Sequence, residues 1–226
     1  MRNRFIEKME RLHKEMLEMG MLCEKAIMKT YKLLLSEENE QENMVKEIDQ
    51  LEHEIDHQER QVETICIQLL LQQQPVASDL RRISAALKMI TDLERIGDQA
   101  TDIAEIIQVG AIKLPISGSR LTQMAEATMK MVNNSIESYV ESSLAMAQEV
   151  IDNDDVVDEH FLAVRREIIE EMKTGEISSD QALDLLMVAK YYERIGDHAS
   201  NIGEWVEFSI TGKHRSGKEI NDVFMV

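Results

Sequence analysis

The chain opens on a long stretch in which apolar residues recur at alternating spacings of four and three. This pattern runs without a break from Phe5 to Leu33. A seam of this kind is typical of an α-helix that packs against partner helices along its whole length. We therefore expect a first helix on the order of 45 Å long. The seam positions are Phe5, Met9, Leu12, Met16, Met19, Cys23, Ala26, Thr30 and Leu33.

The same periodicity predicts five more helices. A second helix carries apolar residues at sevens from Ile48 to Leu69 and ends before Pro75, where a third helix begins and runs to about residue 109. The segment 110–118 breaks the pattern with Gly and Pro. A Ser178–Gln181 capping box marks the start of the sixth helix. The last three helices are predicted over 120–150, 153–173 and 178–210.

An internal repeat organises these six long helices. Residues 94–105 match residues 193–204 at eight of twelve positions, with a constant offset of 99. One helix earlier a second match has an offset of 102, which predicts a shorter connection in the second half. The fold class is therefore all-α, with two tandem pseudo-repeat three-helix bundles. Their predicted ranges are 1–112 and 119–212, followed by a loose tail over 213–226.

Both matches carry the same acidic motif, which is Glu or Asp, three residues, then Asp. Two carboxylates at this spacing lie on one helix face and destabilise the helix by a few tenths of a kcal/mol, roughly, per pair. Water, a basic partner or a cation must relieve that repulsion. The four pairs are Glu52/Asp56, Glu94/Asp98, Asp154/Asp158 and Glu193/Asp197.

The residues inside the motif suggest structural roles. Gly97 and Gly196 lie in mid-helix, where glycine costs about 1 kcal/mol relative to alanine, so we expect them at close helix–helix contacts. We expect Arg95 and Arg194 to pair with nearby acids.

A metal site is the favoured interpretation of the four motifs. In each half the motif-bearing helices are sequential, so that their acidic faces can meet and offer at least four carboxylates. Oxygen ligands suit Mg²⁺, Ca²⁺, Mn²⁺ or iron, whereas zinc is more usually held by Cys or His. Asp102, Asn201 and His198 lie near the motifs and are possible additional ligands.

Two alternatives remain open. In the first, the chain is a metal-free helical adaptor whose acidic stripes are solvated or bind a basic partner surface. In the second, it is a ferritin-like di-iron oxidase, because Glu10–His13 and Glu54–His57 have the E-x-x-H form. Those two segments have no counterpart in the second half, and the chain has no Gly-rich phosphate loop. We therefore expect that it is not an enzyme.

Charge and composition narrow the location and the partners. The net charge of −18 disfavours direct nucleic-acid binding, which needs Lys and Arg to displace counterions from phosphates. Cys23 and Cys66 are isolated among apolar neighbours, so we expect both to be reduced and buried. The start of the chain lacks an apolar signal segment, and no apolar run reaches membrane-spanning length. The predicted location is cytoplasmic, with membrane contact only through partners.

Three segments resemble the PhoU family closely, namely Gln74–Arg81, Asp92–Asp98 and Tyr192–Asp197. The resemblance covers nearly the whole chain and implies two pseudo-symmetric three-helix bundles. It also implies that the acidic motifs hold clusters of iron, zinc or a similar metal. The implied function is that of a cytoplasmic negative regulator of phosphate uptake and of the phosphate-starvation regulon. The implied partners are the ATPase of the phosphate ABC importer, a membrane sensor histidine kinase and a second copy of the chain.

Overall fold

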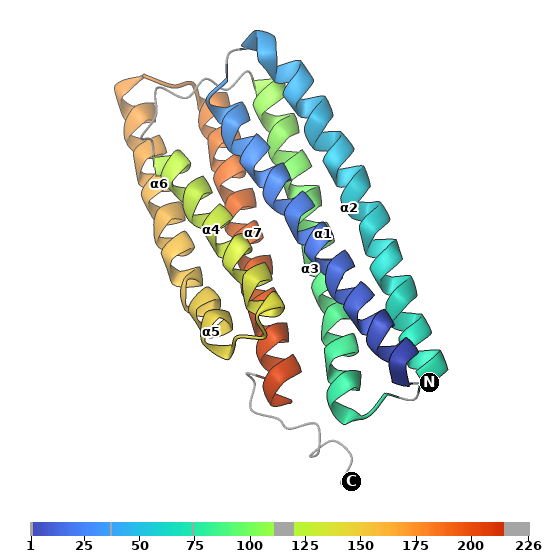
Figure 1. Ribbon diagram of the computed structural model, residues 1–226. Coiled ribbons are helices and arrows are strands. Elements are labelled where there is room, and N and C mark those ends of the chain that lie inside the picture. The colour runs from blue at the N-terminus through green and yellow to red at the C-terminus, as the bar shows by residue number, and fades with distance from the viewer. Residues whose placement is uncertain (1, 37, 74, 111–119, 215–226) are drawn as a thin grey trace, which may run out of the picture.

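The computed structural model describes residues 2–36, 38–73, 75–110 and 120–214. This part of the chain contains seven α-helices and no β-strand. Most of the helices are long and lie side by side in an elongated bundle (Figure 1). Their bounds are α1 Arg2–Leu34, α2 Glu38–Gln73, α3 Ala77–Gly110, α4 Arg120–Val140, α5 Leu144–Asp152, α6 Asp154–Thr174 and α7 Ser179–Thr211.

The apolar seams predicted for the first two helices form the core. On α1 the positions from Leu12 to Leu33 are buried, and Phe5 and Met9 pack against the core at its edge. On α2 Ile48, Ile55 and Val62 are at most 1% exposed. Burial of this continuous stripe is what holds helices of this length straight against one another.

The two predicted bundles correspond to α1–α3 and α4–α7, and they share one core. The buried cluster includes residues from every helix, with α3 and α7 packed against each other along the centre. A second contact joins α1 to α4, where a Cβ on Gly20 would lie 2.7 Å from Ile136 Cδ1. The repeats therefore lie side by side and bury each other.

The prediction of one continuous fourth helix over 120–150 is wrong. The chain leaves helical geometry between α4 and α5, where Ser142 has a φ of +48°. Ser143 then caps α5, because its hydroxyl accepts a hydrogen bond from the Met146 amide at 3.4 Å. The break lets α5 approach α7 closely, so that a Cβ on Gly203 would lie 3.0 Å from the carbonyl oxygen of Ala147.

The bounds of α6 and α7 agree with the predicted helices to within a residue, and both halves of the Ser178–Gln181 capping box form. The predicted shorter connection is wrong, because the α6–α7 loop is one residue longer than the α2–α3 loop. The offset changes because α7 begins three residues closer to its acidic motif than α3 does. The predicted break over 110–118 and most of the tail over 213–226 lie outside the described residues.

Both cysteines are free and buried, as predicted. The Cys23 thiol donates a hydrogen bond to the Leu93 carbonyl at 3.2 Å. Burial raises the pKa of the Cys66 thiol to about 12. None of the described helices has the length and apolar character that crossing a bilayer would require.

Candidate functional site

The acidic motifs of the first half meet where α2 packs against α3. Gly97 makes this possible, because a Cβ there would lie only 3.0 Å from Ile55 Cδ1 on α2. The close approach brings Asp56 and Glu59 of α2 towards Glu94. Burial raises the pKa of Glu94, and the charges of Asp98, Glu59 and Asp56 raise it further, against the opposing effect of Arg95. Carboxylates from two helices therefore share one face.

The second half repeats this geometry between α6 and α7. A Cβ on Gly196 would lie 3.2 Å from Val157 Cγ1, at the position equivalent to the Gly97–Ile55 contact. Burial raises the pKa of Asp154 to about 6, and the charges of Asp197, Asp158, Asp155 and Glu193 add to the shift. The four predicted acids of this half are thus electrostatically coupled across the two helices.

Basic side chains compensate part of this repulsion. Arg95 donates to Asp98 at 2.8 Å and lies 3.4 Å from Glu94, as predicted. Arg60 bonds Asp56 at 3.2 Å, and Lys190 contacts Glu193 at 2.5 Å. Arg194 departs from the prediction, because its guanidinium lies 6.0 Å from the centre of the Tyr191 ring. Each motif-bearing pair of helices thus includes a basic side chain engaged with a motif carboxylate.

Glu52 belongs to a different group. It contacts the ring of His53, and Asp49, Glu52 and His53 offer ligand atoms that all lie within 4.8 Å of one another. Within the described ranges this is the one group of three metal-ligating side chains that is already so compact. The sequence analysis did not identify Asp49 and His53. Glu52 and His53 follow Asp49 by three and four residues, a spacing that places all three on one helix face.

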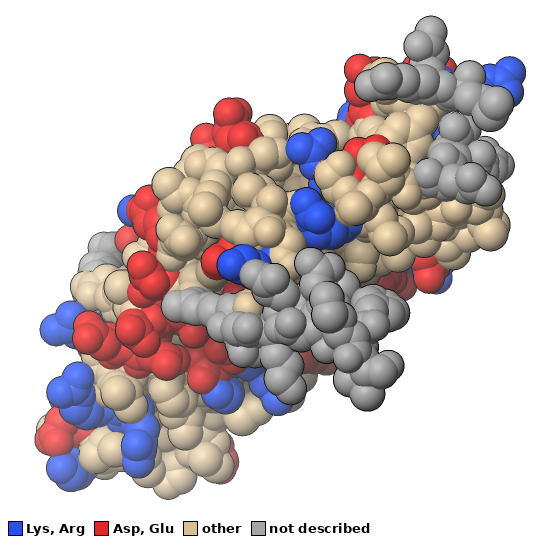
Figure 2. Space-filling model, turned by 90° about the horizontal axis from the view of Figure 1, so that it is seen from below, with Lys and Arg blue, Asp and Glu red and all other residues tan. Residues whose placement is uncertain are grey.

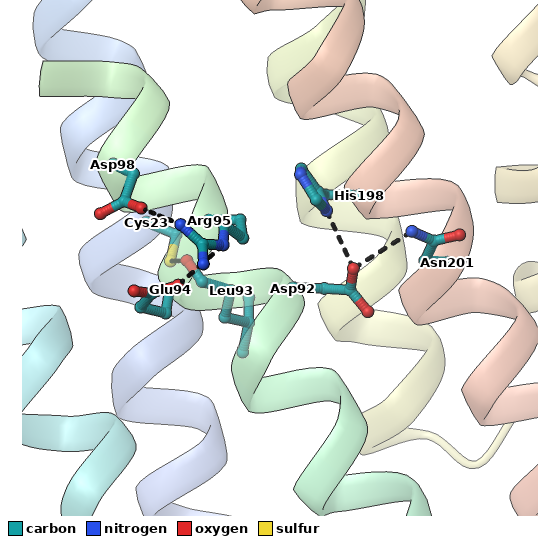
Figure 3. A network of polar contacts seen from close by, with 8 residues as sticks. All are labelled: Cys23, Asp92, Leu93, Glu94, Arg95, Asp98, His198 and Asn201. Carbon is teal, nitrogen blue, oxygen red and sulfur yellow. Dashed lines mark hydrogen bonds and ion pairs between the residues drawn. The ribbon is translucent and has the colours of Figure 1, made fainter. Parts of the chain in front are cut away.

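The three possible additional ligands lie on another surface, between α3 and α7. Asp92 of α3 accepts a hydrogen bond from Asn201 at 3.1 Å, and His198 Nδ1 lies 2.9 Å from the same oxygen. Figure 3 shows Asp92 on one side of α3 and the Glu94–Arg95–Asp98 group on the other. Asp102 of α3 likewise interacts with a side chain of α7, namely Tyr191. Burial raises the pKa of Tyr191, and the charge of Asp102 and its hydrogen bond to Tyr191 raise it further.

These contacts follow the internal repeat. Tyr191 occupies the position of Asp92 in the second half, and Asn201 occupies the position of Asp102. Asp92 with Asn201 and Tyr191 with Asp102 are therefore equivalent pairs across the centre of the molecule. His198 and Asn201 join the two repeats through Asp92, which the sequence analysis did not identify.

The di-iron arrangement gains no support from the side chains that suggested it. His13 stacks on Tyr139 of α4, with ring centres 4.7 Å apart, and Glu54 accepts a hydrogen bond from Gln50 on its own helix. Neither enters a compact metal-ligating group among the residues described.

The duplicated acidic site can be compared with a known protein family. The family model of the PhoU domain matches the chain twice, over residues 16–107 and 121–206. The chain belongs to the PhoU family. Each PhoU match contains one pair of motif-bearing helices, so the duplicated acidic face coincides with the duplicated domain.

Relatives by sequence support the same assignment along the chain. A phosphate-specific transport system accessory protein PhoU homolog from Clostridium acetobutylicum is 36% identical over 211 residues, which cover 92% of this chain and 95% of the relative. A homolog with the same description from a Burkholderia species is 34% identical over 218 residues, covering 93% of this chain and 90% of the relative.

Two crystal structures have the same fold. PhoU from Pseudomonas aeruginosa superposes with a TM-score of 0.84 at 27% identity, covering 92% of this chain and 100% of the other. The phosphate transport system regulatory protein PhoU from Streptococcus pneumoniae has a TM-score of 0.82 at 25% identity, covering 93% and 98%.

Proposed function

We propose that this protein is a cytoplasmic accessory regulator that restrains phosphate uptake and the phosphate-starvation response. The observation that carries the proposal is the duplicated PhoU domain, together with relatives of nearly equal extent that are named accessory proteins of the phosphate-specific transport system. A regulatory rather than catalytic role fits a site made of carboxylates and their basic partners.

A promoter reporter for the starvation response tests this role directly. In a strain lacking the gene and grown with ample phosphate, expression should be high, and restoring the gene should silence it. Unchanged expression in a strain without a second copy of the gene would refute the regulatory role. It would leave control of transport or metal storage as the functions to test.

The acidic faces are proposed to bind metal ions. The donor set fits a cation, because carboxylates from two helices converge, and burial followed by their mutual repulsion raises the pKa values of Glu94, Asp154 and Asp197. A bound cation would supply charge neutralisation and cross-link α2 to α3, or α6 to α7. Iron or zinc is the candidate metal, with Mg²⁺, Mn²⁺ and Ca²⁺ as further possibilities. The proposed ligands are Glu52, Asp56, Glu94, Asp98, Asp154, Asp158, Glu193 and Asp197.

Metal content measured by mass spectrometry separates this proposal from the metal-free adaptor. The variant combines Glu94→Gln, Asp98→Asn, Glu193→Gln and Asp197→Asn, and it should lose bound metal while retaining its helical circular dichroism. Glu137→Gln with Glu141→Gln is a matched control, because these acids have the same spacing but are exposed at the end of α4. Metal content in the variant equal to that of the control would refute metal binding by these acids. Absence of metal from the parent protein, together with loss of partner binding in the variant, would favour the metal-free adaptor.

The proposed partners are the ATPase of the phosphate importer, a sensor histidine kinase and a second copy of this chain. A chain with a net charge of −18 suits basic patches on such partners. We further propose that the protein senses the conformation of the transporter by contact. Its affinity for the ATPase should then differ between trapped nucleotide states, and equal affinity for all of them would exclude this mechanism.

A further inference from the structure

A groove of about 580 Å³ lies where the ends of four helices meet. Its lining comes from α1, α3, α4 and α7. Apolar side chains dominate the wall that α1 supplies, with Phe5, Met9 and the 47% exposed Ile6. Ser142, at the break between α4 and α5, also lines the groove. A partly apolar groove of this volume falls within the size range of ligand-binding sites.

The chain itself leaves α7 beside this groove. Ser209 of α7 lines it, and α7 ends two residues later at Thr211, with Gly212 as its C-cap. Gly212 lies against α3, because a Cβ there would be 3.3 Å from the side chain of Arg81. The neighbours of Arg81 on α3, Asp79 and Arg82, line the groove. The described chain ends at His214, whose ring stacks on that of Phe208, the residue before the groove-lining Ser209, with ring centres 4.2 Å apart.

Residues 215–226 have the length and chemistry of an occupant. Twelve residues reach as far as about 40 Å, which exceeds the extent of such a groove. The segment contains Ile220 and the apolar run 223–226, in a chain that is otherwise strongly acidic. It also carries charges of both signs, at Arg215, Lys218, Glu219 and Asp222.

The groove offers complementary groups to such a segment. Its apolar wall suits the run 223–226, and its charged lining is balanced between Glu10 and Asp79 on one side and Lys14 and Arg82 on the other. Figure 2 shows that uncharged surface is broad at this end of the molecule, with a dense band of acidic side chains along one edge and scattered acidic side chains elsewhere. We propose that residues 215–226 dock into this groove of their own chain.

Photo-cross-linking of the full-length protein tests the proposal. Met225→Cys provides a single reactive thiol for a benzophenone label, because Cys23 and Cys66 are buried and their pKa values are raised. After illumination, mass spectrometry should find cross-links to α1 near Ile6 and to the first turns of α3. These products should migrate as monomers.

Two exposed residues provide the groove variant and its control. Ile6→Asp places a charge in the apolar wall and should lower the cross-link yield about tenfold, the effect of losing one buried apolar contact. Val109→Asp changes an 86% exposed residue at the far end of α3 and should leave the yield unchanged. Circular dichroism confirms that both variants are folded.

Three results would overturn the proposal. Cross-links scattered over the surface would mean that the segment has no defined site. Products found only as dimers would mean that the groove receives the segment of a second copy. An equal yield from Ile6→Asp and the parent protein would mean that the groove is not the binding site.

Discussion

At the scale of single residues, the acidic face is a place where the fold tolerates repulsion. Asp154 shows this most clearly, because burial and four neighbouring acids raise its pKa from 3.8 to about 6. An unfolded chain would release this proton near the lower value. The native state therefore holds the proton more tightly, and ionisation of Asp154 destabilises the fold.

The pH dependence of Asp154→Asn follows from that sign. The native-state penalty is absent below about pH 4, grows between pH 4 and 6, and is complete above pH 6. In the presence of a chelator the variant should match the parent protein at pH 4 and be more stable at pH 7. Urea unfolding at both pH values measures the difference, with the exposed Glu149→Gln on α5 as control.

When the metal is supplied instead of the chelator, the parent protein should be more stable than Asp154→Asn, because the variant lacks a carboxylate that the cation would use as a ligand. A stability gain for Asp154→Asn at both pH 4 and pH 7 would show that its effect does not come from ionisation.

A second residue-scale prediction concerns the glycines at helix contacts. Alanine gains about 1 kcal/mol of helix propensity over glycine. At Gly203 a Cβ would lie 3.0 Å from the carbonyl oxygen of Ala147. This oxygen belongs to the backbone of α5 and cannot move away by a side-chain rotation. Gly203→Ala should therefore destabilise the protein by about 1–3 kcal/mol. At Gly97 the nearest atom is the terminal methyl of Ile55, which can rotate, so Gly97→Ala should cost less.

Denaturant unfolding of both variants checks this order. The double variant Gly97→Ala with Ile55→Val supplies the control, because it removes the methyl group that the new Cβ would meet. If strain at this contact causes the loss of stability in Gly97→Ala, the double variant should recover part of that stability.

Residues differ in how well their roles could be predicted from the sequence. Gly97 and Gly196 were predictable, because a mid-helix glycine repeated at a fixed offset requires a packing reason. Asp92 was not, because its partners lie 106 and 109 residues away and no helical spacing connects them. The motif acids were identified by spacing alone, but spacing could not show that Glu52 points to His53.

At the scale of helices, the break between α4 and α5 is the main departure from the predicted pattern. Glu141-Ser142-Ser143 contains neither Gly nor Pro, so the sequence has no strong signal at the break. The cause is tertiary, since α5 gains its contact with Gly203 only by leaving the line of α4. By contrast, Gly175 and the Ser178–Gln181 capping box are local signals, and the helix bounds beside them were predicted well.

Substitutions at Ser142 test the break. Its φ of +48° is a conformation that costs L-residues about 1–2 kcal/mol and glycine far less. Ser142→Gly should raise the free energy of unfolding by up to about 1 kcal/mol, and Ser142→Val should lower it by about 1–3 kcal/mol. Glu141→Gly is the control, because Glu141 is exposed like Ser142 but has no positive φ. A gain from Glu141→Gly as large as that from Ser142→Gly would contradict this explanation.

At the scale of the whole molecule, duplication predicts two bundles but not how they are joined. The sequence repeat indicates that the halves are alike, whereas their arrangement depends on pairs such as Asp92 with Asn201 that link α3 to α7. These pairs lie beside a continuous core that includes Ile96 and Ile195 from equivalent positions. Neither half buries its central helix alone.

A shared core makes unfolding a single cooperative event. Trp205 on α7, the one tryptophan of the chain, reports on the second repeat, whereas far-UV circular dichroism reports on the helices of both. The two signals should change at the same urea concentration if the repeats unfold together. Independent repeats would give a helical transition without a change in tryptophan fluorescence.

Asp92→Ala provides the decisive comparison, because it leaves His198 and Asn201 without their partner across α3 and α7. The variant should be less stable by about 0.5–1.5 kcal/mol, the net contribution of hydrogen bonds that are at most partly buried. Both signals should nevertheless shift together, since the apolar contacts between α3 and α7 remain. Separation of the two transitions in this variant would mean that the polar pairs, and not the core, couple the repeats.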